Sequence, residues 1–148
     1  MDKDFSKWSA RKPLINKREN HHFAREREVR WCYLGMNIGS EEDGKGDNFS
    51  RPVLIFRRFN ARLCWVIPLT TRRKDNPLHI SINIGDGIER YAIISQLRLI
   101  DTKRLYVCIG KADSDSYCQL VKVLTQIVSP DWEVKKSEAA LDSAAPGP

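Results

Sequence analysis

The sequence lacks several features that define common classes of protein. No stretch of its 148 residues approaches the roughly 18 consecutive apolar residues that a membrane-spanning helix requires. The N-terminus, MDKDFSKW, has no apolar run followed by small residues, so it does not resemble a secretory signal. We therefore expect a cytoplasmic protein with no membrane partner.

Clustered cysteines are also missing. The four cysteines are widely spaced, include no Cys-x-x-Cys pair, and lie in apolar stretches, at Cys32, Cys64, Cys108 and Cys118. A zinc site needs clustered ligands, and a disulfide framework needs an extracellular context. We therefore predict four buried, reduced thiols, no bound metal and no cofactor.

Histidine is scarce, which makes a catalytic triad hard to build. His21 and His22 lie in a polar N-terminal segment and His79 begins an expected strand, so all three are interpreted as surface residues. A phosphate-binding loop is absent too, because Gly44-Lys45-Gly46 lacks the G-x-x-x-x-G-K-[ST] spacing and is interpreted as a flexible loop tip.

Positive charge is present and is concentrated in one place. The net charge is +6, and residues 51–74 contain seven basic side chains and no acidic one. A local positive field favours an anionic partner such as a nucleic acid, because neutralised phosphates release counterions. A solvated basic hairpin explains the same charge equally well.

The order of patterns predicts one domain that is mainly β with some α. Residues 1–27 form a basic, partly helical N-terminal extension, residues 28–129 the folded domain, and residues 130–148 a disordered tail. Period-two alternation or short apolar runs predict strands at 28–34, 53–56, 63–69, 79–84, 91–94, 97–100 and 105–109. Strands this short and numerous suggest a small antiparallel barrel.

Helical spacing closes the domain. Apolar residues between Tyr117 and Val128 recur at a helical period, Asp113 or Ser114 can cap the start, and Pro130 ends the pattern. We therefore predict one amphipathic C-terminal helix.

Polar residues at two strand ends supply the candidate chemistry. Arg51 directly precedes one strand of an expected hairpin, and Thr70 and Thr71 directly follow the other. If the two strands pair, Arg51 and Thr70 emerge at the same end of the sheet, where arginine and hydroxyl donors can share one phosphate. Glu41, in the loop before Arg51, can reach the same edge as a general base for a ribose 2′-OH.

Five short segments resemble, in order and spacing, the MazF/PemK toxins. They are 28–34 (EVRWCYL), 39–41 (GSE), 50–55 (SRPVLI), 68–71 (PLTT) and 94–100 (ISQLRLI), and the resemblance covers about residues 27–128. It implies an SH3-like barrel of the CcdB/PemK kind with a C-terminal helix. It also implies a homodimer that binds RNA in a groove near its interface, and a cognate antitoxin that covers this groove.

The resemblance also implies roles for single residues. Arg51 stabilises the phosphate in the transition state or protonates the leaving oxygen, Thr70 binds the phosphate, and Glu41 is the general base of some members. Candidate RNA contacts are Lys45, Thr71, Arg72, Arg73, Ser95, Gln96 and Arg98. The implied reaction is metal-independent cleavage of single-stranded mRNA, in which the 2′-OH attacks its own 3′-phosphate and leaves a 2′,3′-cyclic phosphate and a 5′-OH.

Three functions remain open on these grounds. Besides the nuclease, a gyrase-inhibiting toxin of the CcdB kind shares the expected fold, and a non-catalytic RNA-binding barrel needs only the basic hairpin. Unpaired bases can stack on exposed aromatic rings, for which Trp31, Phe49 and Trp65 are candidates, with core packing as the other interpretation of both tryptophans.

Overall fold

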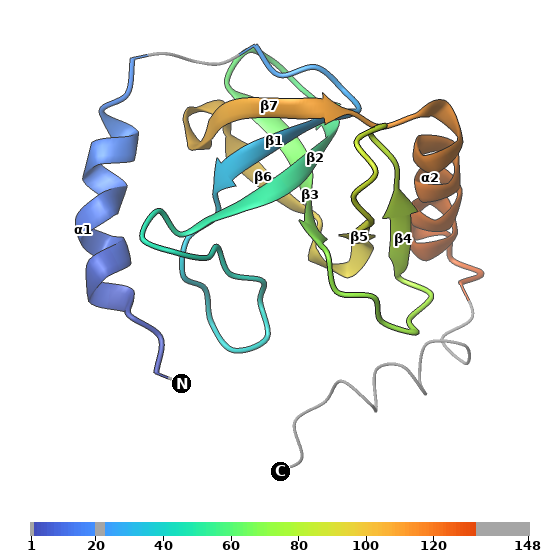
Figure 1. The fold of residues 1–148 in the computed structure, drawn as a ribbon, viewed down its shortest axis with the longest axis horizontal. Coiled ribbons are helices and arrows are strands. Elements are labelled where there is room, and N and C mark those ends of the chain that lie inside the picture. Colours follow the sequence, from blue (N-terminus) through green and yellow to red (C-terminus); the bar gives the residue numbers. More distant parts are fainter. Residues whose placement is uncertain (1, 20–22, 133–148) are drawn as a thin grey trace.

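The computed structural model describes residues 2–19 and 23–132. Residues 133–148 of the tail predicted for 130–148, together with His21 and His22, lie outside the described residues. In chain order the elements are α1 (Phe5–Asn16), β1 (Glu28–Tyr33), β2 (Ser50–Arg58), β3 (Leu63–Thr70), β4 (His79–Ile82), β5 (Arg90–Ile93), η1 (Ile94–Gln96), β6 (Arg98–Asp101), η2 (Thr102–Arg104), β7 (Leu105–Lys111) and α2 (Ser114–Val128). The fold is mainly β with α, as the sequence predicts (Figure 1).

All seven strands belong to one antiparallel sheet whose centre is the β2–β3 hairpin. The strand order is β4-β5-β3-β2-β1-β7, and β6 also pairs with β3. One edge of β3 is shared, because Leu63–Val66 pairs with β6 while Leu69 and Thr70 pair with β5. The short 3-10 turn η1 carries the chain from one partner to the other, so the sheet bends at the end where Thr70 lies.

Apolar side chains on both faces of the hairpin fill two clusters. On β2, Leu54 and Phe56 belong to a cluster that includes Leu120 and Leu124 of α2, whereas Val53 and Ile55 belong to a second cluster. This division follows from the alternation of side chains along a strand. The central strands are therefore covered on both sides, which holds their ends rigidly.

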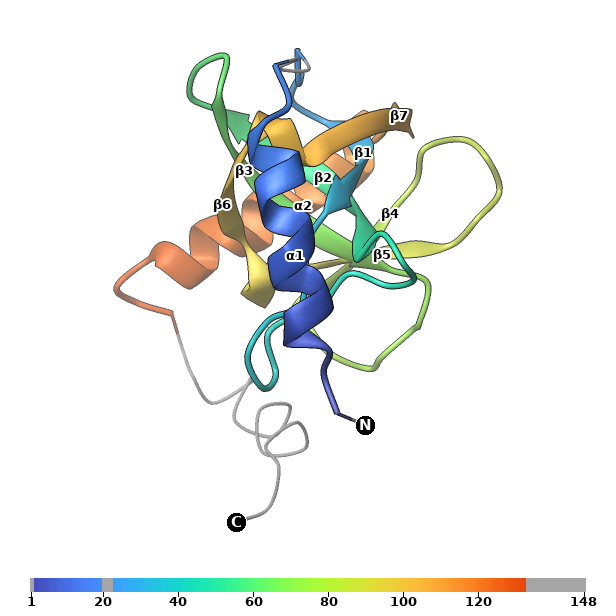
Figure 2. The same ribbon diagram turned by 90° about the vertical axis from the view of Figure 1, so that its left-hand side faces the viewer.

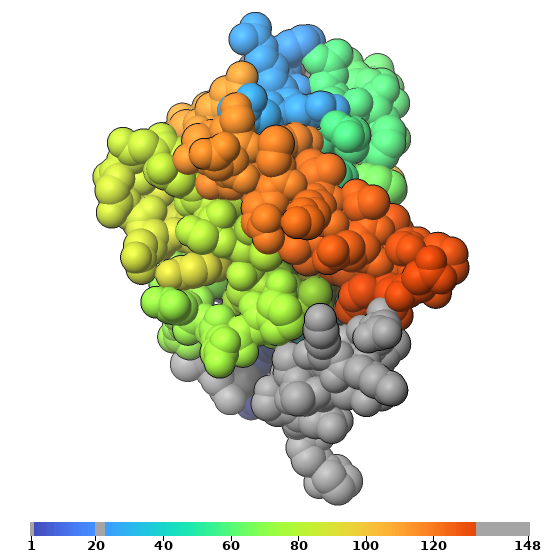
Figure 3. All heavy atoms as spheres, turned by 90° about the vertical axis from the view of Figure 1, so that its right-hand side faces the viewer, coloured from blue at the N-terminus to red at the C-terminus, as the bar shows by residue number. Residues whose placement is uncertain are grey.

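The C-terminal helix begins and ends where the sequence predicts. Asp113 caps α2 by accepting from the Ser116 backbone N–H at 2.7 Å, and Ser129 and Pro130 follow its last residue. The Tyr117 hydroxyl donates to the Phe56 carbonyl oxygen at 2.9 Å. Figure 3 shows α2 on the surface beside the segment that contains β4.

The N-terminal extension is helical and packed on the domain. Asp4 caps α1 by accepting from the Lys7 N–H, and Trp8 and Ile15 bury their side chains. Figure 2 shows α1 lying lengthwise in front of the sheet, with the loop between β1 and β2 beside its N-terminal end. No described helix has the length and apolar character needed to cross a membrane.

The prediction of four buried thiols is wrong for two of them. Cys32 and Cys64 are buried, whereas Cys108 and Cys118 are exposed. Cys108 lies on β7, which pairs only with β1 among the described strands, and Cys118 lies on the outer face of α2. Apolar neighbours in sequence do not reveal which face of an element is covered.

Candidate active site

Arg51 is a buried arginine at the start of β2. Its Cα partner on β1 is Cys32, and only 7% of the residue is exposed. Its Nε donates to the Asp43 carbonyl oxygen at 2.7 Å, and its Nη1 donates to the Leu69 carbonyl oxygen at 3.1 Å. The guanidinium is therefore fixed between the end of β3 and the loop that precedes β2.

A carboxylate from the same loop completes this arrangement. The Nη2 atom of Arg51 lies 2.5 Å from Oε1 of Glu42. Burial lowers the pKa of Arg51, and the negative charges of Glu42 and Asp43 oppose that shift. Arginine keeps its proton in proteins, so the site holds a permanent positive charge that is poorly hydrated and bound to a carboxylate.

Thr70 lies at the same end of the sheet as Arg51. The β2–β3 hairpin pairs Val53 with Pro68, and Arg51 Nη1 donates to the carbonyl oxygen of Leu69, the residue before Thr70. The Thr70 Oγ1 accepts from the Arg72 backbone N–H at 3.1 Å, so its hydroxyl proton can be donated elsewhere. The structure thus places the two residues that the strand ends suggested at the same end of one hairpin.

Glu41 is directed away from this pair. Its Oε2 accepts from the backbone N–H of Ile38 at 2.8 Å, and the residue is exposed. The carboxylate at Arg51 belongs instead to Glu42, which sequence reasoning missed. Adjacent residues in a loop point in different directions, and only the folded turn shows which of two neighbouring glutamates faces the arginine.

Gln96 makes two hydrogen bonds to the loop between β1 and β2. Its Oε1 accepts from the Glu42 N–H at 3.1 Å, and its Nε2 donates to the Ser40 carbonyl oxygen at 3.2 Å. Gln96 lies in η1, between β5 and β6. In this structure the predicted RNA contact therefore positions Glu42.

The other predicted RNA contacts are more exposed than Arg51. Thr71, Arg72 and Arg73 are exposed and directly follow β3, and the positive charge of Arg72 acts on Arg51. Lys45 and Ser95 are exposed as well, whereas Arg98 on β6 is half-buried. The cationic side chains that follow β3 are therefore far more exposed than Arg51.

His79 is a further titratable group near the site. Its ring is half-buried, and its Nδ1 atom is buried without a hydrogen-bond partner in the described structure. Burial and the positive charge of Lys74 lower the pKa of His79, and Glu42 opposes this shift. Glu42 thus interacts with both His79 and Arg51, which the interpretation of His79 as a surface residue overlooked.

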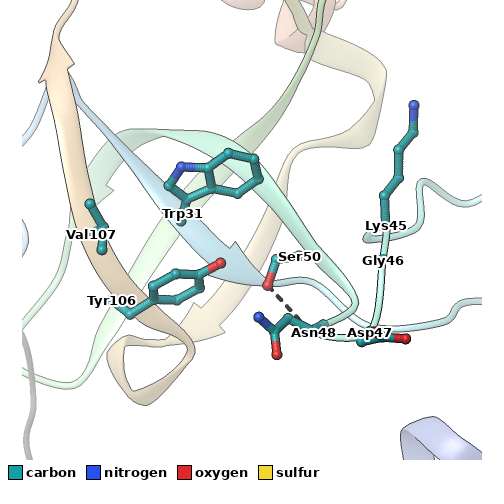
Figure 4. Close-up of a pocket in the computed structure, with 8 residues that line it drawn as sticks. All are labelled: Trp31, Lys45, Gly46, Asp47, Asn48, Ser50, Tyr106 and Val107. Carbon is teal, nitrogen blue, oxygen red and sulfur yellow. Dashed lines mark hydrogen bonds between the residues drawn. The ribbon is translucent and has the colours of Figure 1, made fainter.

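An open pocket lies beside the N-terminal end of β2 (Figure 4). Trp31 and Tyr106 supply aromatic walls, and Lys45, Asn48 and Ser50 supply polar groups. Of the other proposed stacking residues, Phe49 is buried and Trp65 is 39% exposed. Trp31, a candidate for base stacking, and Lys45, a candidate RNA contact, therefore line the same pocket.

Side chains that could bind a metal are not clustered in the described residues. Across residues 2–19 and 23–132 no cluster of three or more histidine, cysteine, aspartate or glutamate side chains has the required proximity. The donor set around Arg51 is instead cationic and suited to an anion.

Comparisons with known proteins agree with the observed fold. MazF of Deinococcus radiodurans superposes with a TM-score of 0.60 at 18% identity, over 72% of this chain and 97% of that one. An endoribonuclease from Mycobacterial species gives a TM-score of 0.57 at 16% identity, over 78% and 100% of the two chains. An endoribonuclease from Mycobacterial species in complex with its cognate antitoxin gives a TM-score of 0.56 at 15% identity, over 74% of this chain and 99% of that one.

The family of the chain is shown by a match to a family model over most of its length. No curated protein sequence matches this chain. The model for PemK-like, MazF-like toxins of type II toxin–antitoxin systems, however, matches residues 25–128, which include the whole sheet and α2. The chain therefore belongs to the PemK-like, MazF-like toxins of type II toxin–antitoxin systems.

Proposed function

We propose that the protein is a toxin endoribonuclease that cleaves single-stranded RNA without a metal ion. The observation that carries this proposal is that Arg51 donates to the carbonyl oxygen of Leu69, the residue before Thr70, at one end of the β2–β3 hairpin. A fixed guanidinium and a hydroxyl donor at one end of a hairpin can hold a phosphodiester and stabilise the charge that develops on its oxygens. The endoribonuclease from Mycobacterial species with a similar fold supports the same activity.

The reaction that fits these groups is an internal transfer. The ribose 2′-oxygen attacks the adjacent phosphorus, the bond from phosphorus to the 5′-oxygen of the next nucleotide breaks, and the products carry a 2′,3′-cyclic phosphate and a 5′-OH. The 2′-OH proton passes to a general base, and the leaving oxygen takes a proton from a general acid. In-line attack needs a backbone free to leave duplex geometry, so the substrate is single-stranded.

The general base is assigned to the glutamate pair of the loop. Glu41 and Glu42 are adjacent, and Glu42 is the one in contact with Arg51. When a phosphate takes the place of the Glu42 carboxylate on Arg51, that carboxylate is released next to the bound ribose. Glu42 is therefore the base in this proposal, with Glu41 as the alternative that the family resemblance implies.

We further propose that a homodimer binds the RNA and that a cognate antitoxin neutralises it. The complex of the Mycobacterial endoribonuclease with its antitoxin supports the second point. Light scattering of the purified protein measures the first, since a monomer mass at micromolar concentration would contradict it.

Cleavage of a mixed-sequence RNA in excess chelator tests the proposal. Wild type should produce fragments with 5′-OH ends, and Arg51→Ala should reduce the rate by about a hundredfold to a thousandfold, as for loss of an oxyanion donor. Arg51→Lys keeps the charge but loses the planar donor set, so its cleavage rate should lie between those of wild type and Arg51→Ala. Because Arg51 is buried, circular dichroism and thermal melts of each variant must show an intact fold.

Intact RNA after incubation with the wild type would contradict the nuclease and favour the gyrase-inhibiting or the RNA-binding function. Cleavage that survives Arg51→Ala would show that the reaction uses another site.

A further inference from the structure

Residues 2–19 precede the family match, which begins at residue 25, yet they contact the loop that covers Arg51. This loop, residues 35–49, connects β1 to β2 and contributes Glu42 and the Asp43 carbonyl oxygen to the guanidinium. The N-terminal segment is therefore linked to the surroundings of Arg51 through this loop.

Lys3 is the centre of this contact. Its Nζ donates to the carbonyl oxygens of Asn37 at 2.7 Å and Gly39 at 2.8 Å, and it lies 2.9 Å from Oδ2 of Asp43. These three partners match the three protons of an ammonium group. The side chains of Lys3 and Asp43 are 24% and 26% exposed, so the ion pair is partly shielded from water.

Asp43 contacts both Lys3 and Arg51 and so links the two. Its carboxylate binds Lys3 and also accepts from the Asn37 N–H at 2.6 Å, while its carbonyl oxygen accepts from Arg51 Nε at 2.7 Å. A shift of Asp43 away from Lys3 would therefore move its carbonyl oxygen, which accepts a hydrogen bond from the guanidinium.

The helix holds both ends of the same loop. Trp8 is 4% exposed and packs against Phe49, with ring centroids 5.6 Å apart. It also covers Gly35, where an added Cβ would lie 2.4 Å from the indole. Near the loop's far end, Arg11 donates to the Asn48 side-chain oxygen at 2.6 Å.

We propose that residues 2–19 form a latch that holds the 35–49 loop closed over Arg51, so that RNA binds only when the loop opens. The proposal rests on the proposed function for its effect on RNA, but the closed loop itself does not. Arg51 is 7% exposed in the latched form, and an anionic phosphate must displace Glu42 to reach it. When only an open minority binds, the apparent affinity falls in proportion to that minority.

The test uses the full chain with one lysine changed at a time. Lys3→Ala removes the ion pair and both hydrogen bonds, and Lys3→Glu adds repulsion against Asp43. Lys17→Ala and Lys17→Glu are matched controls, because Lys17 is an exposed lysine that directly follows α1. Hydrogen exchange followed by mass spectrometry then measures the opening of residues 35–49 in all four variants, without any RNA present.

The expected result is exchange in this loop about tenfold faster in Lys3→Ala than in wild type, and faster still in Lys3→Glu, with both Lys17 variants unchanged. Binding of a non-cleavable, 2′-O-methylated RNA should tighten in Lys3→Ala by up to about tenfold. A purely structural role of Lys3 would lower the melting temperature without strengthening RNA binding.

Equal exchange in Lys3→Ala and Lys17→Ala would overturn the latch. Faster exchange combined with weaker RNA binding would overturn it as well, because the closed loop would then assist binding. If no variant cleaves RNA, the proposed function fails, while the exchange rates still decide whether the latch exists.

Discussion

The Glu42 carboxylate lies 2.5 Å from Nη2 of Arg51 and occupies that donor of the guanidinium. Planar guanidinium groups bind carboxylates and phosphates through the same donors. The closed site therefore contains its own anion, and under the proposed function this internal ion pair competes with the phosphate of an RNA strand. Buried arginine with no paired anion would be costly, which explains why the loop supplies one.

We predict opposite effects of Glu42→Gln on RNA binding and on RNA cleavage. Loss of the negative charge removes the competitor, so a non-cleavable 2′-O-methylated RNA should bind more tightly. Loss of the base should slow single-turnover cleavage by about a hundredfold to ten-thousandfold. Fluorescence anisotropy measures the first quantity and quenched-flow kinetics the second.

Glu41→Gln is the matched control, since Glu41 is the neighbouring exposed carboxylate and accepts from the backbone N–H of Ile38. It should change cleavage little. The assignment of the base would pass to Glu41 if its variant lost activity while Glu42→Gln kept it.

Much of this architecture can be predicted from the sequence, because local rules agree with the fold. Period-two alternation located the strands, and the Asp113 cap and Pro130 bounded the last helix. The Arg-Pro and Leu-Thr-Thr steps placed Arg51 and Thr70 at one end of a hairpin, since antiparallel neighbours joined by a short turn share their ends.

The features that the sequence does not predict depend on contacts between segments that are far apart in the chain. The 35–49 loop has no periodic pattern, so the sequence could not show that Glu42 rather than Glu41 faces Arg51. Packing of the extension was also invisible, because Trp8 is one apolar residue among charges and its partner Gly35 has no side chain to suggest a contact.

Thiol reactivity should divide the four cysteines into two pairs. Burial raises the pKa of both Cys32 and Cys64 to about 12, so neither forms the reactive thiolate near neutral pH. Cys108 and Cys118 are exposed. An aromatic disulfide reagent at pH 8 should therefore modify two thiols rapidly and the other two only after addition of denaturant.

The variant Cys108→Ser/Cys118→Ser provides the control and should show no rapid phase. Rapid modification of more than two thiols in the wild type would contradict the burial of Cys32 and Cys64.

Gly44 should tolerate no side chain, because the loop folds back on itself there. A Cβ at this position would lie 1.7 Å from the Phe49 carbonyl oxygen, and backbone cannot move aside as a flexible side chain can. The Gly44 N–H also donates to the Gly35 carbonyl oxygen at 2.8 Å, so displacing the chain would break a second contact. We expect Gly44→Ala to lower the free energy of unfolding by about 3 kcal/mol, as measured by urea titration.

Gly46→Asn is the control: Gly46 has a φ of +68° with open space around it, and asparagine adopts this conformation at a cost of about 1 kcal/mol or less. Equal stability of the two variants would mean that the loop is not closed in solution as the contacts of Gly44 require, and the covering of Arg51 would then lose its structural basis.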